Sequence, residues 1–444
     1  MRVRILSLFL LAALSAASVP AESRRVTMSE AVDLALRDNA LLKIARLKVR
    51  ESDAKRRAAR SDYFPKLSNE SQLWHTLNRQ EVVVPAGALG VYSGVGLIPK
   101  SPIRIEQGGD NLLLTGTTLG QPLTQLLKIR QGHRIAQLDE ALASNDVKKT
   151  ENEIALKVHE IYFAVLISQR QRRALELQVS AAEEKLRDSQ RAVQTGNVLE
   201  VAEIGSRANL LERRHALLAL ENQISDLTVE FNDMLGLPLD TDVELVPPPP
   251  ADASPASIEE CMKIALAEST EVRAAQQTVE KARSAVIAAR TDYIPELSLF
   301  AEHIYQSGVP LLARNNGILG LKMTWNIFDF GKRGDVVDER KALLGQAEEN
   351  LRRLRNRVLV DVEKGYRKVE RSRQMMEVAG EALVLRREAE RLSSDQLETG
   401  LVVLAAHKEN AAALAKAEAD ALAAQLGFQL AQAELERTMG RTAR

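Results

Sequence analysis

The chain has few of the residues on which enzymes, metal proteins and disulfide-stabilised domains depend. Its 444 residues include one cysteine, Cys261, so no disulfide can form within the chain. The six histidines show no His-Glu-x-x-His spacing, and the sequence contains neither a Walker loop nor a dinucleotide-binding fingerprint. We therefore expect no catalytic site, no metal site and no bound cofactor, and we expect that the protein is not an enzyme.

Charge of one sign and long hydrophobic runs are also lacking. The 60 basic and 60 acidic residues cancel, which argues against nucleic acid as a partner. Residues 1–21 have the features of a secretory signal peptide: Arg2 and Arg4, an apolar run of about ten residues, and the small-residue site Val19-Pro20-Ala21. No other apolar run reaches the roughly 18 residues of a membrane helix. The sequence thus predicts an exported protein without a transmembrane helix.

What the sequence does contain is an internal duplication. The segment Asp62-Tyr63-Phe64-Pro65 returns 230 positions later as Asp292-Tyr293-Ile294-Pro295. Towards the end of each copy the shift is 204 positions, since Thr195-Gly196 matches Thr399-Gly400. The difference of 26 residues indicates an insertion in the first copy. We predict a first repeat at residues 22–239, a proline-rich linker at 240–256 and a second repeat at 257–444, so that one structural unit is used twice.

Each repeat is predicted to contain a helix, a β-hairpin, a very long helix and a further helix. The capping-box sequences at Thr27 and Ser257 start the first helices, which end before Pro65 and Pro295. Residues 317–328 alternate between apolar and polar, which indicates a strand with one apolar face. Weaker alternation predicts further strands at residues 67–78, 113–123 and 297–306.

The long helices are predicted at residues 128–194 and 332–398, and the helices after them at 199–235 and 401–438. From Ile154 to Val193 the first long helix has mostly apolar residues at alternating steps of four and three, the spacing of a coiled-coil seam, which Ser168, Arg172 and Ser189 dilute. At about 1.5 Å per residue such a helix is roughly 100 Å long, far longer than globular helices. The composition, with 27% charged residues, agrees with long helices in water.

Strands of about ten residues are long enough to cross a membrane when tilted. Four strands cannot close a barrel, and an open sheet in lipid would leave edge groups without hydrogen bonds. Three chains would supply twelve strands, so strands in a membrane require an oligomer.

The order of these elements resembles the TolC-type outer-membrane factors, also called outer membrane efflux proteins. The features that carry the resemblance are the tandem halves, the Tyr63-Phe64-Pro65 and Tyr293-Ile294-Pro295 corners, the junctions Gln121-Pro122-Leu123 and 325–331, and the two Thr-Gly turns. The resemblance implies a mainly α fold with a membrane β-barrel portion. In it, tandem units of long helices and a β-hairpin form a trimeric 12-stranded barrel and an α-helical periplasmic tunnel.

The resemblance also implies a function and partners. The protein is expected to be a homotrimer that contacts outer-membrane lipid and extends into the periplasm. It would be the passive exit duct of a tripartite efflux or type I secretion system. A periplasmic membrane-fusion (adaptor) protein and an inner-membrane efflux pump or ABC exporter would deliver the substrates.

By position, Gly196 and Gly400 would mark the periplasmic tips of the helices. The expected adaptor contacts are then Val198, Leu199, Leu401 and Leu404. Members of the family often carry acidic rings shortly after the second tip glycine, but residues 401–406 contain no carboxylate. Glu200 and Glu203 in the first repeat, with His407 in the second, are the candidates for a pore constriction; the alternative is a solvated helix face.

A second hypothesis accounts for the signal peptide and the heptads without a barrel. The chain would then be a soluble periplasmic coiled-coil scaffold or adaptor, and its strands would form a small soluble domain. Clean alternation over residues 317–328 favours the membrane protein.

Overall fold

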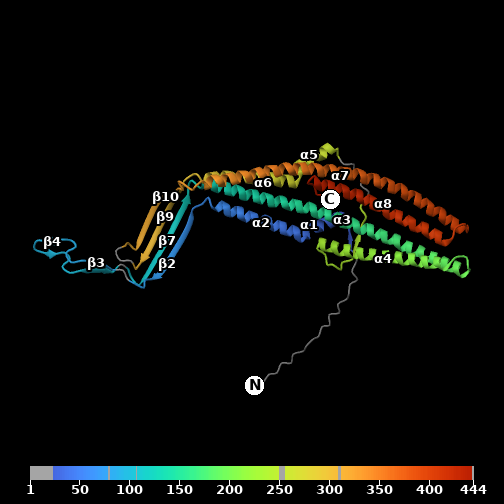
Figure 1. The fold of residues 1–444 in the computed structure, drawn as a ribbon, viewed down its shortest axis with the longest axis horizontal. Helices are drawn as coiled ribbons and strands as arrows, with labels where there is room; N and C mark the ends of the chain where they lie inside the picture. Colours follow the sequence, from blue (N-terminus) through green and yellow to red (C-terminus); the bar gives the residue numbers. More distant parts are fainter. Residues whose placement is uncertain (1–23, 79–80, 107, 250–255, 309–311, 443–444) are drawn as a thin grey trace, which may run out of the picture. The chain divides into compact units, whose positions relative to one another are not determined.

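A computed structural model describes residues 24–78, 81–106, 108–249, 256–308 and 312–442 of the chain (Figure 1). The predicted signal peptide and residues 250–255 of the predicted linker lie outside these ranges. The chain forms two compact units. Unit 1 comprises Met1–Ile44, Val147–Thr270 and Asn356–Arg444, and unit 2 comprises Ala45–Asp146 and Glu271–Arg355. Each unit therefore takes segments from both predicted repeats.

Unit 2 contains one antiparallel sheet of four strands, in the order β10-β9-β7-β2 (Figure 1). The strands are β2 (Lys66–His75), β7 (Asn111–Pro122), β9 (Glu296–Ser307) and β10 (Asn315–Thr324). All four predicted strands are present. The prediction that the last one continues to residue 328 was wrong, because the chain leaves the sheet after Thr324 to enter the next helix.

The two hairpins of this sheet show the duplication in their backbone pairing. Lys66 lies opposite Gly120 in the first hairpin, and Glu296 lies opposite Thr324 in the second. These pairs are related by the same shifts of 230 and 204 positions that relate the sequences. The repeat therefore preserves strand register, and register decides on which face of the sheet each side chain lies.

The insertion in the first repeat forms a two-stranded extension between β2 and β7. β3 (Glu81–Val84) pairs with β6 (Ile103–Glu106), and β4 (Val91–Tyr92) pairs with β5 (Gly96–Leu97). Val82 lies opposite Ile105 and Val84 opposite Ile103, so one face of this hairpin is apolar.

Each repeat has four helices where three were predicted, because the first predicted helix of each repeat forms two. The first repeat has α1 (Met28–Asp38), α2 (Ala40–Ser61), α3 (Leu126–Gln194) and α4 (Glu200–Leu235), and the second has α5 (Ile258–Glu268), α6 (Thr270–Thr291), α7 (Lys332–Glu398) and α8 (Leu404–Thr438). The hydroxyls of Thr27 and Ser257 accept hydrogen bonds from the amides three residues later, as the capping boxes predict. Among the described residues, no helix has the length and apolar character needed to cross a membrane.

Two boundaries differ from the prediction or sharpen it. The first predicted helix of each repeat is divided by a single extended residue: Asn39 separates α1 from α2, and Ser269 separates α5 from α6. The last helix begins at Leu404 rather than Leu401, because the turn after Gly400 uses Leu401 and Val402 before Val403 caps the helix.

In unit 1 the four long helical segments lie in the order α4-α3-α8-α7 (Figure 1). Arg214 on α4 pairs with Glu183 on α3, and Lys185 on α3 pairs with Glu409 on α8. Lys368 on α7 pairs with Glu434 on α8. The outer members of this layer are consequently α4 and α7.

The core of unit 1 lies where α3 and α4 pack on α1 and on a small parallel sheet that the sequence did not reveal. In this sheet β1 (Arg24–Val26) pairs with β8 (Val243–Leu245). The strand β8 thus lies within the predicted proline-rich linker at 240–256. Three-residue strands are too short to show alternation, so no sequence pattern indicated them.

Tyr162 on α3 ties this small sheet to the core. Its side chain is fully buried, and its hydroxyl donates towards the carbonyl oxygens of Val26 (2.9 Å) and Val246 (2.7 Å). The same hydroxyl accepts a hydrogen bond from the Val246 amide at 3.0 Å. Burial, opposed by the bond to Val246, raises the pKa of Tyr162 to about 12, which keeps the hydroxyl protonated.

We expect Tyr162→Phe to lower the free energy of unfolding by about 1–3 kcal/mol, because buried backbone groups lose their partner. Thermal or denaturant unfolding of the purified protein in detergent measures the change. Tyr92→Phe, at a half-exposed position, is the matched control. Equal stability of both variants would show that the hydroxyl does not contribute.

Candidate functional site

The predicted helical tips are the turns between α3 and α4 and between α7 and α8, both in unit 1. Gly196 and Gly400 have φ values of 74° and 72°, a left-handed conformation that glycine adopts without strain. The amide of Asn197 bonds to the carbonyl oxygen of Ala192, and that of Leu401 bonds to Gln396, both at 2.9 Å. Each turn is a helix-ending motif of the kind that favours glycine, and the two are equivalent under the 204-residue shift.

The tips expose large apolar side chains. Leu199 is 77% exposed and Leu401 is 79% exposed, and Val198 and Leu404 are also exposed. Leu199 and Val403 cap α4 and α8 without a side-chain hydrogen bond. Leucine is a poor N-cap residue, so neither helix start is optimised for stability in water.

The constriction candidates differ in their surroundings. Glu200 is exposed, whereas Glu203 is half-buried and accepts a hydrogen bond from Gln190 of α3 at 3.2 Å. His407 is half-buried on α8, and its Nδ1 atom has no hydrogen-bond partner among the described residues. The structure therefore places Glu203 against α3, whereas Glu200 is exposed to solvent.

Near the tips, a buried carboxylate joins the two helical hairpins. Glu184 on α3 is 5% exposed, and its carboxylate lies 3.3 Å from Lys408 Nζ on α8 and 3.2 Å from Arg187. Sequence analysis missed this group, because the i to i+3 pair with Arg187 looks like an ordinary surface pair and the partner on α8 is 224 residues away. The contact holds α3 and α8 side by side close to their tips.

The sheet of unit 2 has two chemically different faces. Strand register places odd-numbered residues on one face, and that face is apolar at both ends: Leu67, Leu73, Leu113, Leu119, Leu299, Leu319, Leu321 and Met323. The even-numbered residues lie on the other face, here called the polar face because it carries the charged side chains, among them Glu70, Glu302 and Lys322. The same face also has large apolar side chains: Trp74, Leu112, Leu114, Phe300, Ile304 and Ile318. Most of the large apolar side chains of the first face are exposed, so no part of the described chain covers it.

Both edges of this sheet are open. Over the described residues, β2 pairs only with β7 and β10 pairs only with β9. Each edge therefore presents backbone amides and carbonyls that no strand of the same chain satisfies.

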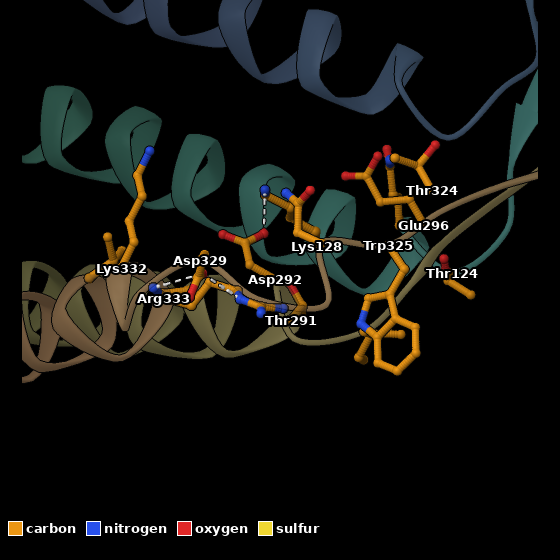
Figure 2. Close-up of a pocket in the computed structure, with 15 residues that line it drawn as sticks. Thr124, Lys128, Thr291, Asp292, Glu296, Thr324, Trp325, Asp329, Lys332 and Arg333 are labelled. Carbon is orange, nitrogen blue, oxygen red and sulfur yellow. Dashed lines mark hydrogen bonds and ion pairs between the residues drawn. The ribbon is translucent and has the colours of Figure 1, made fainter.

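At the strand-to-helix junction of unit 2, polar side chains surround a cavity of about 300 Å³ (Figure 2). Lys128 pairs with Asp292 at 2.6 Å, and Asp329 pairs with Arg333 at 2.6 Å. Asp329 also accepts from the amides of Gly331 and Arg333 and so caps α7. Burial alone would raise the pKa of Asp329, but these bonds outweigh it and lower the pKa below its usual value. Each charged group in these two ion pairs has a partner of opposite charge within the cavity wall. We therefore assign the cavity a structural role.

The segment between β10 and α7 exposes Ile327, Phe328 and Phe330. Phe330 is 90% exposed and has a φ of 55°, which is unusual for a bulky residue. The Phe328 and Phe330 rings contact edge to face, with centroids 4.7 Å apart. These aromatic side chains are presented at the end of an open sheet edge.

Comparisons with known proteins agree with this geometry. The profile of the family described as "Outer membrane efflux protein" matches residues 31–237 and 262–441. A comparison with curated protein sequences gave no significant match.

Several solved outer-membrane channels share the fold. The CmeC channel of Campylobacter jejuni superposes with a TM-score of 0.74 and 16% identity, over 93% of this chain and 85% of that one. For VceC of Vibrio cholerae the TM-score is 0.71 and the identity 13%, over 93% and 96% of the two chains. For MtrE of Neisseria gonorrhoeae, solved in an open state, they are 0.65 and 16%, over 94% and 89%.

The family profile covers most of the chain in two successive segments, and the family is one of channel proteins rather than enzymes. The soluble scaffold is therefore not favoured. The chain belongs to the outer membrane efflux protein family, and its role is that of an efflux duct in the outer membrane.

Proposed function

We propose that the protein works as a homotrimer, in which a 12-stranded barrel crosses the outer membrane and a helical tunnel continues into the periplasm. An adaptor and an inner-membrane efflux pump or ABC exporter deliver the substrates, and the duct itself performs no chemistry. The observation that carries this proposal is the four-stranded sheet with two open edges and one face that is apolar at both ends. In lipid, such edges must pair, and three sheets of four strands supply a closed ring of twelve.

The outer helices of unit 1 support the same ring. Exposed residues at alternating steps of three and four form one stripe on α4, the α4 stripe: Val201, Ile204, Ala208, Leu211, His215 and Leu218. A similar α7 stripe consists of the exposed residues Met375, Val378, Ala382, Leu385 and Leu392 together with the half-buried Ala389. Both have the spacing of a coiled-coil seam, yet neither seam is filled within the chain.

Because the two stripes differ and lie on opposite outer helices of the layer, they suit a head-to-tail contact between copies. The α4 stripe of one copy would meet the α7 stripe of the next. Such heterologous contacts close into rings. The stripes also lie at similar distances from the tips, since Val201 follows Gly196 by five residues and Leu392 precedes Gly400 by eight.

We expect Leu385→Glu to dissociate the trimer, because it places a charge in a seam where leucine burial contributes about 1.5–3 kcal/mol per interface. Native mass spectrometry in detergent measures the oligomeric state. Val384→Glu makes the same change on the neighbouring residue, which is also exposed but lies outside the stripe. A trimer that survives Leu385→Glu as well as Val384→Glu would contradict the interface.

The exposed tips are proposed as the adaptor-binding surface. Leu199 follows Gly196 by three residues and Leu401 follows Gly400 directly, so each hairpin exposes a leucine at its tip. Three copies therefore present six apolar contacts. Exposed apolar side chains beside weakly capped helix starts are features that a partner protein would cover.

We expect the double variant Leu199→Asp/Leu401→Asp to remain trimeric but to lose cross-linking to the periplasmic adaptor in intact cells. Charged side chains at both contacts oppose burial. Leu89→Asp changes an equally exposed leucine in the β3–β6 extension and should keep the cross-link. Adaptor cross-linking at the wild-type level in the tip variant would rule out this surface.

A constriction by Glu200 and Glu203 is proposed for the periplasmic end, with His407 at the position in the second repeat that corresponds to Glu203. In three copies the two glutamates supply six carboxylates, and acidic rings favour cations in a pore. The position of Glu200 in solvent supports its part more directly than the hydrogen-bonded position of Glu203 does.

The reconstituted protein is expected to carry ion current across planar bilayers. Glu200→Lys/Glu203→Lys should shift the reversal potential in a salt gradient towards anions, since the ring changes sign. Glu212→Lys, an exposed change further along α4, is the control. Absence of current from the wild-type trimer would reject the duct, and an unchanged reversal potential in the double variant would reject the ring.

A further inference from the structure

The duplication supplies a template for the joint between two copies. We infer that β10 of one copy pairs antiparallel with β2 of the next in a fixed register, in which Leu321 lies opposite the partner's Leu73. The inference rests on the proposed ring and specifies how its sheets join. The occupant of both open edges is a second copy of this chain.

The template is the joint inside the chain, where the hairpin of the first repeat meets the hairpin of the second. There β7 pairs antiparallel with β9, with Thr117 opposite His303 and Thr118 opposite Glu302. In a ring of three copies, six such hairpins alternate between repeats. The strand β10 is the equivalent of β7, and the β2 of the next copy is the equivalent of β9.

Applying the two shifts converts one joint into the other. Adding 204 to Thr117 gives Leu321, and subtracting 230 from His303 gives Leu73. In the same way Thr118 and Glu302 become Lys322 and the partner's Gln72. The register is meaningful because the hairpins themselves obey these shifts without a slip at Lys66–Gly120 and Glu296–Thr324.

The side chains brought together by this register match in character. Leu321 and the partner's Leu73 both belong to the apolar face, so lipid would cover the pair. On the polar face, Lys322 lies opposite the partner's Gln72 and diagonal to the partner's Glu70, within reach of a long cationic side chain. Lys322 forms no ion pair among the described residues of its own chain.

The exposed aromatic segment after β10 also gains a partner. In the template, Thr124 follows β7 and its hydroxyl donates to the carbonyl of Pro295 at 2.7 Å and accepts from the Leu297 amide at 2.8 Å. The shifted position of Thr124 is Phe328, which faces the partner's Phe64-Pro65 corner. Phenylalanine cannot make the two hydrogen bonds, so apolar packing of Ile327, Phe328 and Phe330 on this corner replaces them.

Paired cysteines test the register in a Cys261→Ser background. Because hydrogen-bonded and non-hydrogen-bonded pairs alternate along antiparallel strands, two neighbouring pairs are needed: Leu73→Cys with Leu321→Cys, and Gln72→Cys with Lys322→Cys. The control, Leu73→Cys with Leu319→Cys, is displaced by two residues on the same face. Within one chain these cysteines cannot meet, since β7 and β9 separate β2 from β10 by about 14 Å.

After oxidation of the reconstituted protein, we expect at least one in-register pair to give most of the chain as disulfide-linked dimers and trimers. The displaced control should give little linkage. Stronger linkage in the control would overturn the register while leaving the trimer intact. No linkage in any pair, together with a monomer by native mass spectrometry, would overturn the trimer as well.

Discussion

The constraint on which the rest of the structure depends is that a lipid bilayer offers no hydrogen bonds to a sheet edge. The chain carries four long strands with an apolar face, but it leaves β2 and β10 open on their outer sides. A single copy is therefore incomplete as a membrane structure. The helical part is incomplete in the same sense. The stripes on α4 and α7 are exposed and have coiled-coil spacing, but no helix of the same chain packs against them.

The duplication allows a single type of joint between hairpins to pair all the strand edges. Each repeat contributes one hairpin and one pair of long helices, and preserved strand register means that neighbouring hairpins can join by one geometry. The buried Glu184 and its contact with Lys408 perform a related task in unit 1, because they hold the helical pairs of the two repeats together. The pairing of β7 with β9 inside the chain thus provides the pattern for the pairing of β10 with β2 of the next chain.

Much of this fold could be predicted because its elements are long. The helices of 69 and 67 residues show their period clearly. Three of the four long strands alternate only weakly, and the repeat supports them because each stands at the same place in its copy. The three-residue strands β1 and β8 escaped prediction, since they depend on a tertiary partner, Tyr162, rather than on local pattern. The end of β10 was misplaced because Ile327 continues the alternation although Asp329 already caps the next helix. The roles of the tip residues stay predictions, because contacts with a partner leave no trace in one chain.

One feature breaks the equivalence of the repeats: within the described residues, the first hairpin carries the β3–β6 extension and the second has no counterpart. A ring of three such chains would be nearly sixfold in its strands yet strictly threefold at the rim where the extensions stand. Molecules approaching from outside the cell would meet three arms separated by three gaps. Changes in the β3–β6 extension can in this way alter the selectivity of the external mouth without any change in the barrel strands or the long helices.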